Sequence, residues 1–192
     1  MKFRTAIPLT LLIVAAAAIW RAELIDVSPP GVAPRPLTAT AAASRPSVSL
    51  DVILPAVPVG MHHLTSNRHV QLIHYWAPWE RHSRAQIAAL DSLRREPGLE
   101  RLQVAVVCFD PFPSVARFVA RQRVRLAVLL DGAGELRRAL PCPSIPYTYV
   151  IDGSGRIAIA QSGEVDWWAP ETGATLRRLL AEPEAPRNPA RL

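Results

Sequence analysis

The stretch HVQLIHYWAPWERHSRAQIAALDSL, residues 69–93, decides the fold. Residues 70–76, VQLIHYW, are mostly apolar and resemble the continuous apolar kind of strand that is covered on both faces. The turn WAPWERHS follows, and residues 83–96 then repeat apolar side chains at helical spacing, with Ser83 as the predicted N-cap. The stretch therefore predicts a buried strand, a turn and an amphipathic helix.

Strands and helices alternate through the rest of the chain. Further strands are predicted at residues 102–110, 126–131, 147–152 and 156–163, and further helices at 113–122, 134–140 and 170–182. Gly153 and Gly155 favour a tight turn that joins the last two strands as a hairpin. Parallel strands need crossover helices, whereas a hairpin adds antiparallel strands. The pattern predicts an α/β fold of three layers, with a mixed central sheet flanked by helices.

The chain divides into four predicted parts. Charged residues precede an apolar run over residues 6–20, which at 15 residues is short for a spanning helix of about 17–25. Residues 1–21 are therefore interpreted as a signal peptide or membrane anchor, and both interpretations place the domain outside the cytoplasm, in the periplasm or cell envelope. The other three parts are a Pro/Ala-rich linker at 22–47, the folded domain at 48–182 and a disordered tail at 183–192.

The net charge of +6 does not indicate nucleic-acid binding. Residues 48–182 hold 15 arginines against 13 acidic residues, so most of the excess positive charge lies at the termini. The domain also lacks a basic stripe interleaved with exposed aromatic residues. No nucleic-acid partner is expected.

Four segments together resemble a known family. They are LIHYWAPW, VAVVCFD, VLLDGAGELRRAL and IPYTYVIDGSGRIAIAQSGEVDW, and their order and spacing resemble the TlpA/ResA-like family, the membrane-tethered thiol–disulfide oxidoreductases of the bacterial cell envelope. The likeness covers about residues 50–182. It implies a thioredoxin-like fold with a cis-proline, Pro146, facing the active site.

The resemblance places the two cysteines of that family's motif on Glu80 and Ser83, with Arg81 and His82 between them. Thiol exchange needs one thiolate that attacks sulfur and a second thiol that resolves the mixed disulfide. A carboxylate and an unactivated hydroxyl do neither. The ordinary CxxC mechanism is therefore excluded at this turn.

The chain has two cysteines, Cys108 and Cys142, in segments that the predicted topology brings to one edge of the sheet. Three interpretations remain open: two unrelated buried thiols, a structural or regulatory disulfide, or a redox pair relocated from the usual motif.

A metal site is a weaker alternative. His62, His63, Glu80 and His82 are residue types that bind metals, but their spacing matches no established ligand pattern. We expect no cofactor and assign no metal ligands with this spacing.

The resemblance also implies a groove for an extended client, and Trp76, Trp79, Ile145 and Pro146 are its predicted lining. Packing in the core is the competing interpretation for the tryptophans. The favoured function is an exported domain without CxxC activity that binds, scaffolds or helps to mature an envelope protein or peptide. A thiol–disulfide oxidoreductase that uses Cys108 and Cys142 is the alternative, and a metal-binding chaperone is the weaker one.

Overall fold

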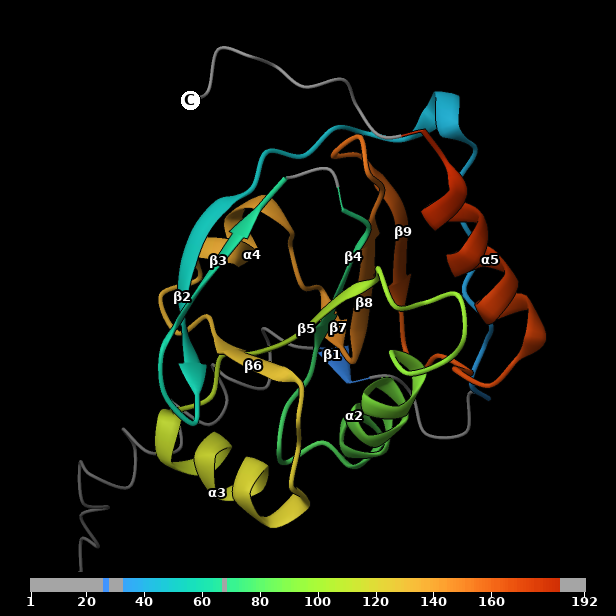
Figure 1. Cartoon of the computed structure of the whole chain (residues 1–192). Helices are drawn as coiled ribbons and strands as arrows, with labels where there is room; N and C mark the ends of the chain where they lie inside the picture. Colours follow the sequence, from blue (N-terminus) through green and yellow to red (C-terminus); the bar gives the residue numbers. More distant parts are fainter. Residues whose placement is uncertain (1–25, 28–32, 67–68, 184–192) are drawn as a thin grey trace, which may run out of the picture.

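A computed structural model describes residues 26–27, 33–66 and 69–183 of the 192-residue chain (Figure 1). The strands are β1 (Asp26–Val27), β2 (Asp51–Val57), β3 (Met61–Thr65), β4 (Gln71–Tyr75), β5 (Gln103–Cys108), β6 (Ala127–Leu130), β7 (Ser144–Ile145), β8 (Tyr147–Ile151) and β9 (Ile157–Ser162). The helices are the 3-10 turn η1 (Ala42–Ser44), α2 (Arg81–Leu93), α3 (Phe112–Gln122), α4 (Glu135–Ala139) and α5 (Pro170–Ala181).

A seven-stranded mixed sheet forms the centre of the domain, in the order β3-β2-β6-β5-β4-β8-β9. Strands β4, β5 and β6 run parallel, joined by helical crossovers, and β8 and β9 form the predicted antiparallel hairpin. All five residues of β4 are buried, including the polar Gln71 and His74, as expected for a central strand covered on both faces.

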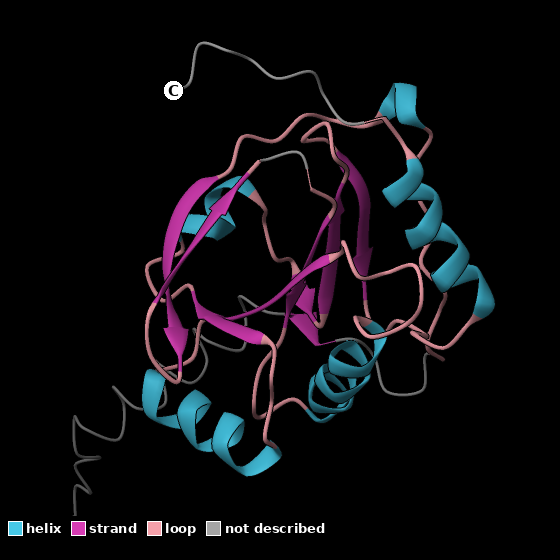
Figure 2. Cartoon of the chain, viewed as in Figure 1, coloured by secondary structure: helices cyan, strands magenta, loops and turns pink. Residues whose placement is uncertain are grey.

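Helices cover both faces of the sheet (Figure 2). The core on one face takes its side chains from α2, α3 and α5, and the core on the other face includes Leu136 of α4. Successive side chains of β4 alternate between the two cores, with Leu72 in one and Ile73 in the other. The predicted three-layer α/β fold is confirmed.

One hairpin was not predicted from the sequence. Strands β2 and β3 pair antiparallel and extend the sheet beyond β6. Gly60, in the turn between them, has a φ of 119°, a conformation that other residues rarely adopt. The segment Pro58–Gly60 was the sequence signal for this turn.

Residues 33–47, here called the strap, pack against the domain, and the predicted linker over residues 22–47 is wrong for this part. Leu37 is 1% exposed and belongs to the core between the sheet and α5. The backbone of the strap also pairs with edge strand β9: Thr40 N–H donates to Ala158 at 2.8 Å, and Ile157 N–H donates to Pro46 at 2.8 Å. The strap remains ordered because it buries apolar surface and satisfies the edge of the sheet, which the proline count did not reveal.

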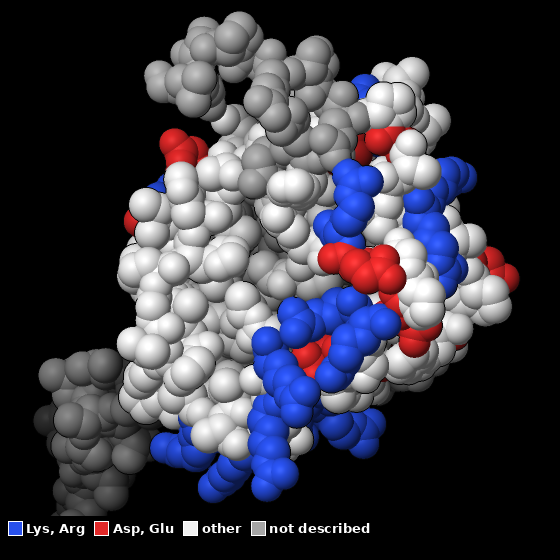
Figure 3. All heavy atoms as spheres, in the orientation of Figure 1, with Lys and Arg blue, Asp and Glu red and all other residues white. Residues whose placement is uncertain are grey.

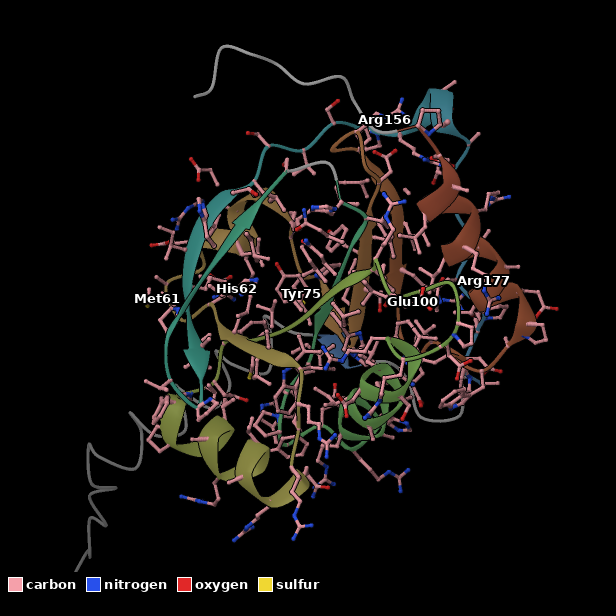
Figure 4. The ribbon with its side chains drawn as sticks, in the orientation of Figure 1. Met61, His62, Tyr75, Glu100, Arg156 and Arg177 are labelled. Atoms are coloured by element: carbon pink, nitrogen blue, oxygen red, sulfur yellow. The ribbon has the colours of Figure 1, made fainter. Side chains whose placement is uncertain are left out.

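A buried ion pair fixes the end of the strap. Arg45 donates to the carboxylate of Asp152 at 2.9 Å and also contacts Glu182, just beyond α5. The hydrogen bond to Glu182 raises the pKa of Arg45 above its ordinary value. Burial acts to lower this pKa, and the hydrogen bond to Asp152 acts to raise it further. Arg156 lies beside the same corner, where it donates to Ala42 of the strap at 3.2 Å (Figure 4).

The predicted anchor at residues 6–20 and all but the first residue of the predicted tail at 183–192 lie outside the described residues. In the described part of the chain, no helix combines the length and the apolar character needed to cross a membrane.

Candidate functional site

The site is built around the first turn of α2, which follows the central strand β4. Glu80, rather than the predicted Ser83, is the N-cap of this helix. Its carboxylate accepts the backbone N–H of His82 at 3.0 Å and also that of Ser83. These are the free amide groups at a helix N-terminus that favour negative charge.

Ser83 lies one turn inside α2 and does not face solvent. Its side chain is 0% exposed, and its hydroxyl oxygen has no hydrogen-bond partner in the part of the chain that the structure describes. A buried hydroxyl without a hydrogen bond to a base among the described residues is neither activated nor accessible to a substrate.

The start of α2 is held in place by the loop after β9. His82 contacts the carboxylate of Glu164 through Nδ1. The side-chain amide of Gln86 forms two hydrogen bonds with the backbone of Val165. It donates to the carbonyl at 3.0 Å and accepts from the N–H at 3.0 Å. This double contact fixes the helix against the loop and closes that side of the site.

The proline loop has the predicted geometry, with a cis peptide bond between Ile145 and Pro146. Both residues are nevertheless buried. Strand β1 pairs in parallel with β7, in the register Asp26 with Ser144 and Val27 with Ile145, so a segment of this chain already pairs with the backbone before the proline.

The predicted groove lined by Trp76, Trp79, Ile145 and Pro146 is therefore not an open surface. Trp76 is 0% exposed, and its ring packs on Phe118 with the centroids 4.7 Å apart. Of the four predicted residues only Trp79 is exposed, at 53%. Core packing is thus correct for Trp76, whereas Trp79 faces solvent.

The two cysteines are free and lie in the cores on opposite faces of the sheet. Cys108 packs in the core covered by α2, α3 and α5, whereas Cys142 packs against the core on the α4 face. Burial raises the pKa of each thiol to about 12. Cys108 and Cys142 are not near each other and form no disulfide, which agrees with the interpretation as two unrelated thiols. A redox role for these two residues stays an alternative prediction.

The residues predicted for a metal site do not converge. His62 (Figure 4) and His63 are exposed on the edge strand β3. The Nε2 atom of His63 contacts Asp51 at 2.6 Å. Glu80 and His82 lie at the start of α2, directly after β4. In the sheet, strands β2, β6 and β5 lie between β3 and β4. Within the described ranges, no group of three or more His, Cys, Asp or Glu side chains is placed to hold a metal ion.

Solved structures share this architecture. A putative thiol:disulfide interchange protein DsbE from Chlorobium tepidum matches 70% of this chain and 97% of its own length, with a TM-score of 0.61 and 20% identity. StoA from Bacillus subtilis matches 70% of this chain and 98% of its own, with a TM-score of 0.57 and 15% identity. A secreted disulfide oxidoreductase of Mycobacterium tuberculosis matches 68% and 95%, with a TM-score of 0.54 and 11% identity.

The chain has a thioredoxin-like fold. The predicted resemblance to cell-envelope thiol–disulfide oxidoreductases is confirmed at the level of the fold. No protein-family model and no curated protein matches the sequence. Because a fold does not carry an activity, the chemistry of this thioredoxin-like domain has to be judged from its own residues.

One feature of the thioredoxin-like domain was missed from the sequence: a cleft of about 650 Å³ between the start of α2 and α3. Trp79 lines it together with Arg84, Arg117 and Arg121. The signal was present in the sequence, because Arg117 and Arg121 are four residues apart within the predicted helix and therefore share one face.

Proposed function

We propose that this protein is an exported binding domain of the cell envelope, with a thioredoxin-like fold and without CxxC thiol chemistry. The observation that carries the proposal is the carboxylate of Glu80 at the N-terminus of α2. This is the kind of position where a reactive cysteine has its pKa lowered by the helix amides. Here the carboxylate of Glu80 accepts those N–H groups, and a carboxylate cannot take the place of a thiol in disulfide exchange.

The remaining thiols support the same conclusion. Disulfide exchange in two steps requires a thiolate to attack and a second thiol within reach to displace it. Cys108 is buried and Cys142 is partly buried; the pKa of each thiol is raised, and the two lie on opposite faces of the sheet. Neither completes a pair with the other.

Export is supported by two observations. The charged residues Lys2 and Arg4 and the apolar run over 6–20 have the form of a signal peptide or an anchor. One structural neighbour is described as a secreted disulfide oxidoreductase. An envelope protein or peptide is the proposed client, and the exposed Trp79 is the anchor residue that remains on the surface beside the former active-site turn.

The test is turnover of a disulfide substrate by the full chain, with dithiothreitol as the reductant. Three proteins are compared: the native chain, the Glu80→Cys/Ser83→Cys variant and the Cys108→Ser/Cys142→Ser variant. In the restored variant, one thiolate attacks the substrate disulfide and releases one substrate thiol. The second cysteine then displaces the other thiol, and dithiothreitol reduces the disulfide left in the protein.

We expect the native chain to match the rate without protein and the restored variant to exceed it. That result would show a scaffold that is intact but lacks a nucleophile. Native turnover above the background that disappears in the Cys108→Ser/Cys142→Ser variant would overturn the proposal.

A further inference from the structure

The cleft beside Trp79 is positively charged. Figure 3 shows arginine side chains gathered over α2 and α3 in the lower part of the molecule. Three arginines line the cleft, Arg84, Arg117 and Arg121, against a single acidic residue, Asp110. None of the three arginines forms an ion pair with another described residue, so their charges are available to a ligand.

The walls of the cleft are apolar between these charges. Trp79 is 53% exposed, and Pro78, Pro111 and Pro113 line the same cavity. A rigid indole beside prolines offers flat apolar surface at a small cost in conformational entropy. The cleft therefore suits a ligand that alternates carboxylates with apolar groups.

A second cleft, of about 580 Å³, continues from the first. Asp110 and Pro111 line both cavities, and the second is bounded by the exposed side chains of Ile53, Met61 and Phe112. A ligand that passes over the loop at Pro111 reaches arginines on one side and apolar side chains on the other. This continuity favours an extended chain over a compact ion.

We propose that the Trp79 cleft binds an extended acidic segment of another exported protein, with Arg84, Arg117 and Arg121 contacting its carboxylates and Trp79 packing on its apolar side chains. The proposal rests on the binding role proposed above and names the chemistry of the client. Arginine suits this task because its planar guanidinium group pairs with a carboxylate through two parallel hydrogen bonds.

An anionic membrane surface is the competing partner for such arginines, and the geometry disfavours it. A lipid surface presents its charges in a plane, whereas these side chains border an open cleft between α2 and α3 whose lining includes Trp79. Attraction to anionic lipids also does not require the indole to pack on a ligand side chain.

The experiment measures binding of a labelled, glutamate-rich peptide that contains leucine, by fluorescence anisotropy with the full chain at about 0.15 M salt, where the Debye length is about 8 Å. The comparison peptide has every glutamate replaced by glutamine. The test variants are Arg84→Ala/Arg121→Ala and Trp79→Phe. The control is Arg138→Ala/Arg178→Ala, which removes the same charge from α4 and α5, outside the cleft.

We expect the glutamate peptide to bind and the glutamine peptide to bind far more weakly. The Arg84→Ala/Arg121→Ala variant should lose about tenfold or more in affinity, because two charge-assisted contacts are removed. The control variant should stay within about twofold of the native protein, because distant charges are largely screened. The peptide should also change the tryptophan fluorescence of the native protein, and Trp79→Phe should remove that change.

Three results would overturn the proposal: no binding of the glutamate peptide, equal binding of both peptides, or unchanged affinity in Arg84→Ala/Arg121→Ala. A fourth would assign the arginines to lipid, namely vesicles of phosphatidylglycerol that bind the native chain but not this variant, while the peptide binds neither. Failure of peptide binding with a silent reductase assay would remove only this cleft assignment. Native reductase turnover would instead remove the proposed function, whatever the peptide does.

Discussion

The carboxylate of Glu80 accepts the backbone N–H of His82 at 3.0 Å, and it also accepts the N–H of Ser83. This residue therefore caps α2 at the position where the resemblance to cell-envelope oxidoreductases places a cysteine. In this chain the position carries a structural contact.

The first prediction concerns this cap. Replacing Glu80 by Ala should lower the free energy of unfolding by about 1 kcal/mol, because two amides at the helix N-terminus lose their acceptor. Replacing it by Gln should cost less, since the amide oxygen still accepts while the charge is lost. Urea denaturation at neutral pH measures both, with Glu96→Ala as a control for loss of a carboxylate elsewhere. An alanine variant as stable as the native protein would show that the cap contributes nothing.

The second prediction concerns Arg45. Replacing Arg45 by Ala should lower the free energy of unfolding by about 3 kcal/mol, because the buried carboxylate of Asp152 loses its charged partner. Lysine should restore only part of the loss, since one ammonium group cannot reproduce the contacts of a guanidinium with two carboxylates. Chemical denaturation of both variants, beside Arg178→Ala on the exposed face of α5, provides the measurement.

The ion pair also predicts a dependence on pH. Burial acts to raise the pKa of Asp152, but hydrogen bonds from Arg45 and from the backbone of Arg156 and Ser154 outweigh it and leave this pKa below its usual range. A carboxyl group with a lower pKa in the folded state stabilises the protein above its unfolded pKa, and this stability is lost as the pH falls through the folded value. The Arg45→Ala variant should lose less stability than the native protein on acidification below about pH 4. An equal loss in both proteins would contradict this assignment.

The third prediction concerns His74. Burial lowers the pKa of this imidazole to about 3, while its Nδ1 contacts the hydroxyl of Thr148 at 3.0 Å. The unfolded chain takes up a proton near the ordinary histidine pKa of about 6.5, and the folded chain does not. Stability should therefore fall as the pH drops below about 6.5, by about 1 kcal/mol per pH unit.

The measurement is the free energy of unfolding between pH 7 and pH 5 for the native protein and for His74→Gln. Glutamine is neutral over this range and retains a hydrogen-bonding group for Thr148. The variant should show a shallower slope. Equal slopes would mean that other groups cause the pH dependence.

The fourth prediction concerns the thiols. Cys108 and Cys142 should react slowly with a thiol-specific reagent at pH 8 in the folded chain, because burial raises both pKa values to about 12 and leaves little thiolate. Both should react rapidly in urea. Mild oxidation should not join them within one molecule, since they pack on opposite faces of the sheet. Mass spectrometry of the oxidised protein measures this, and an intramolecular disulfide in the folded protein would contradict it.

The sequence was sufficient to predict the central strands and the helices, because their burial follows a simple period. The apolar run in β4 and the helical spacing in α2 are local signals, and both elements form where they were expected. The cis peptide bond at Pro146 was also expected, because the resemblance implied it.

The details of the site depend on contacts between distant segments. Nothing near Ser83 in the sequence indicated that Glu80 would cap the helix in its place. The burial of Ile145 and the separation of the two thiols depend on which face of the sheet each side chain packs against. The sequence of the connecting loops does not predict that face. The ion pair of Arg45 could not be predicted from the sequence either, because its partner Asp152 is more than a hundred residues away.

The strap has a consequence for how this protein is handled and how it tolerates truncation. Without residues 33–47, strand β9 would present unpaired N–H and C=O groups along its outer edge, and such an edge recruits a strand from another molecule. A chain that begins at residue 48 should therefore associate through β9 into larger assemblies, and one that retains the strap should not. We therefore expect the proline-rich segment before the domain to protect the fold from self-association.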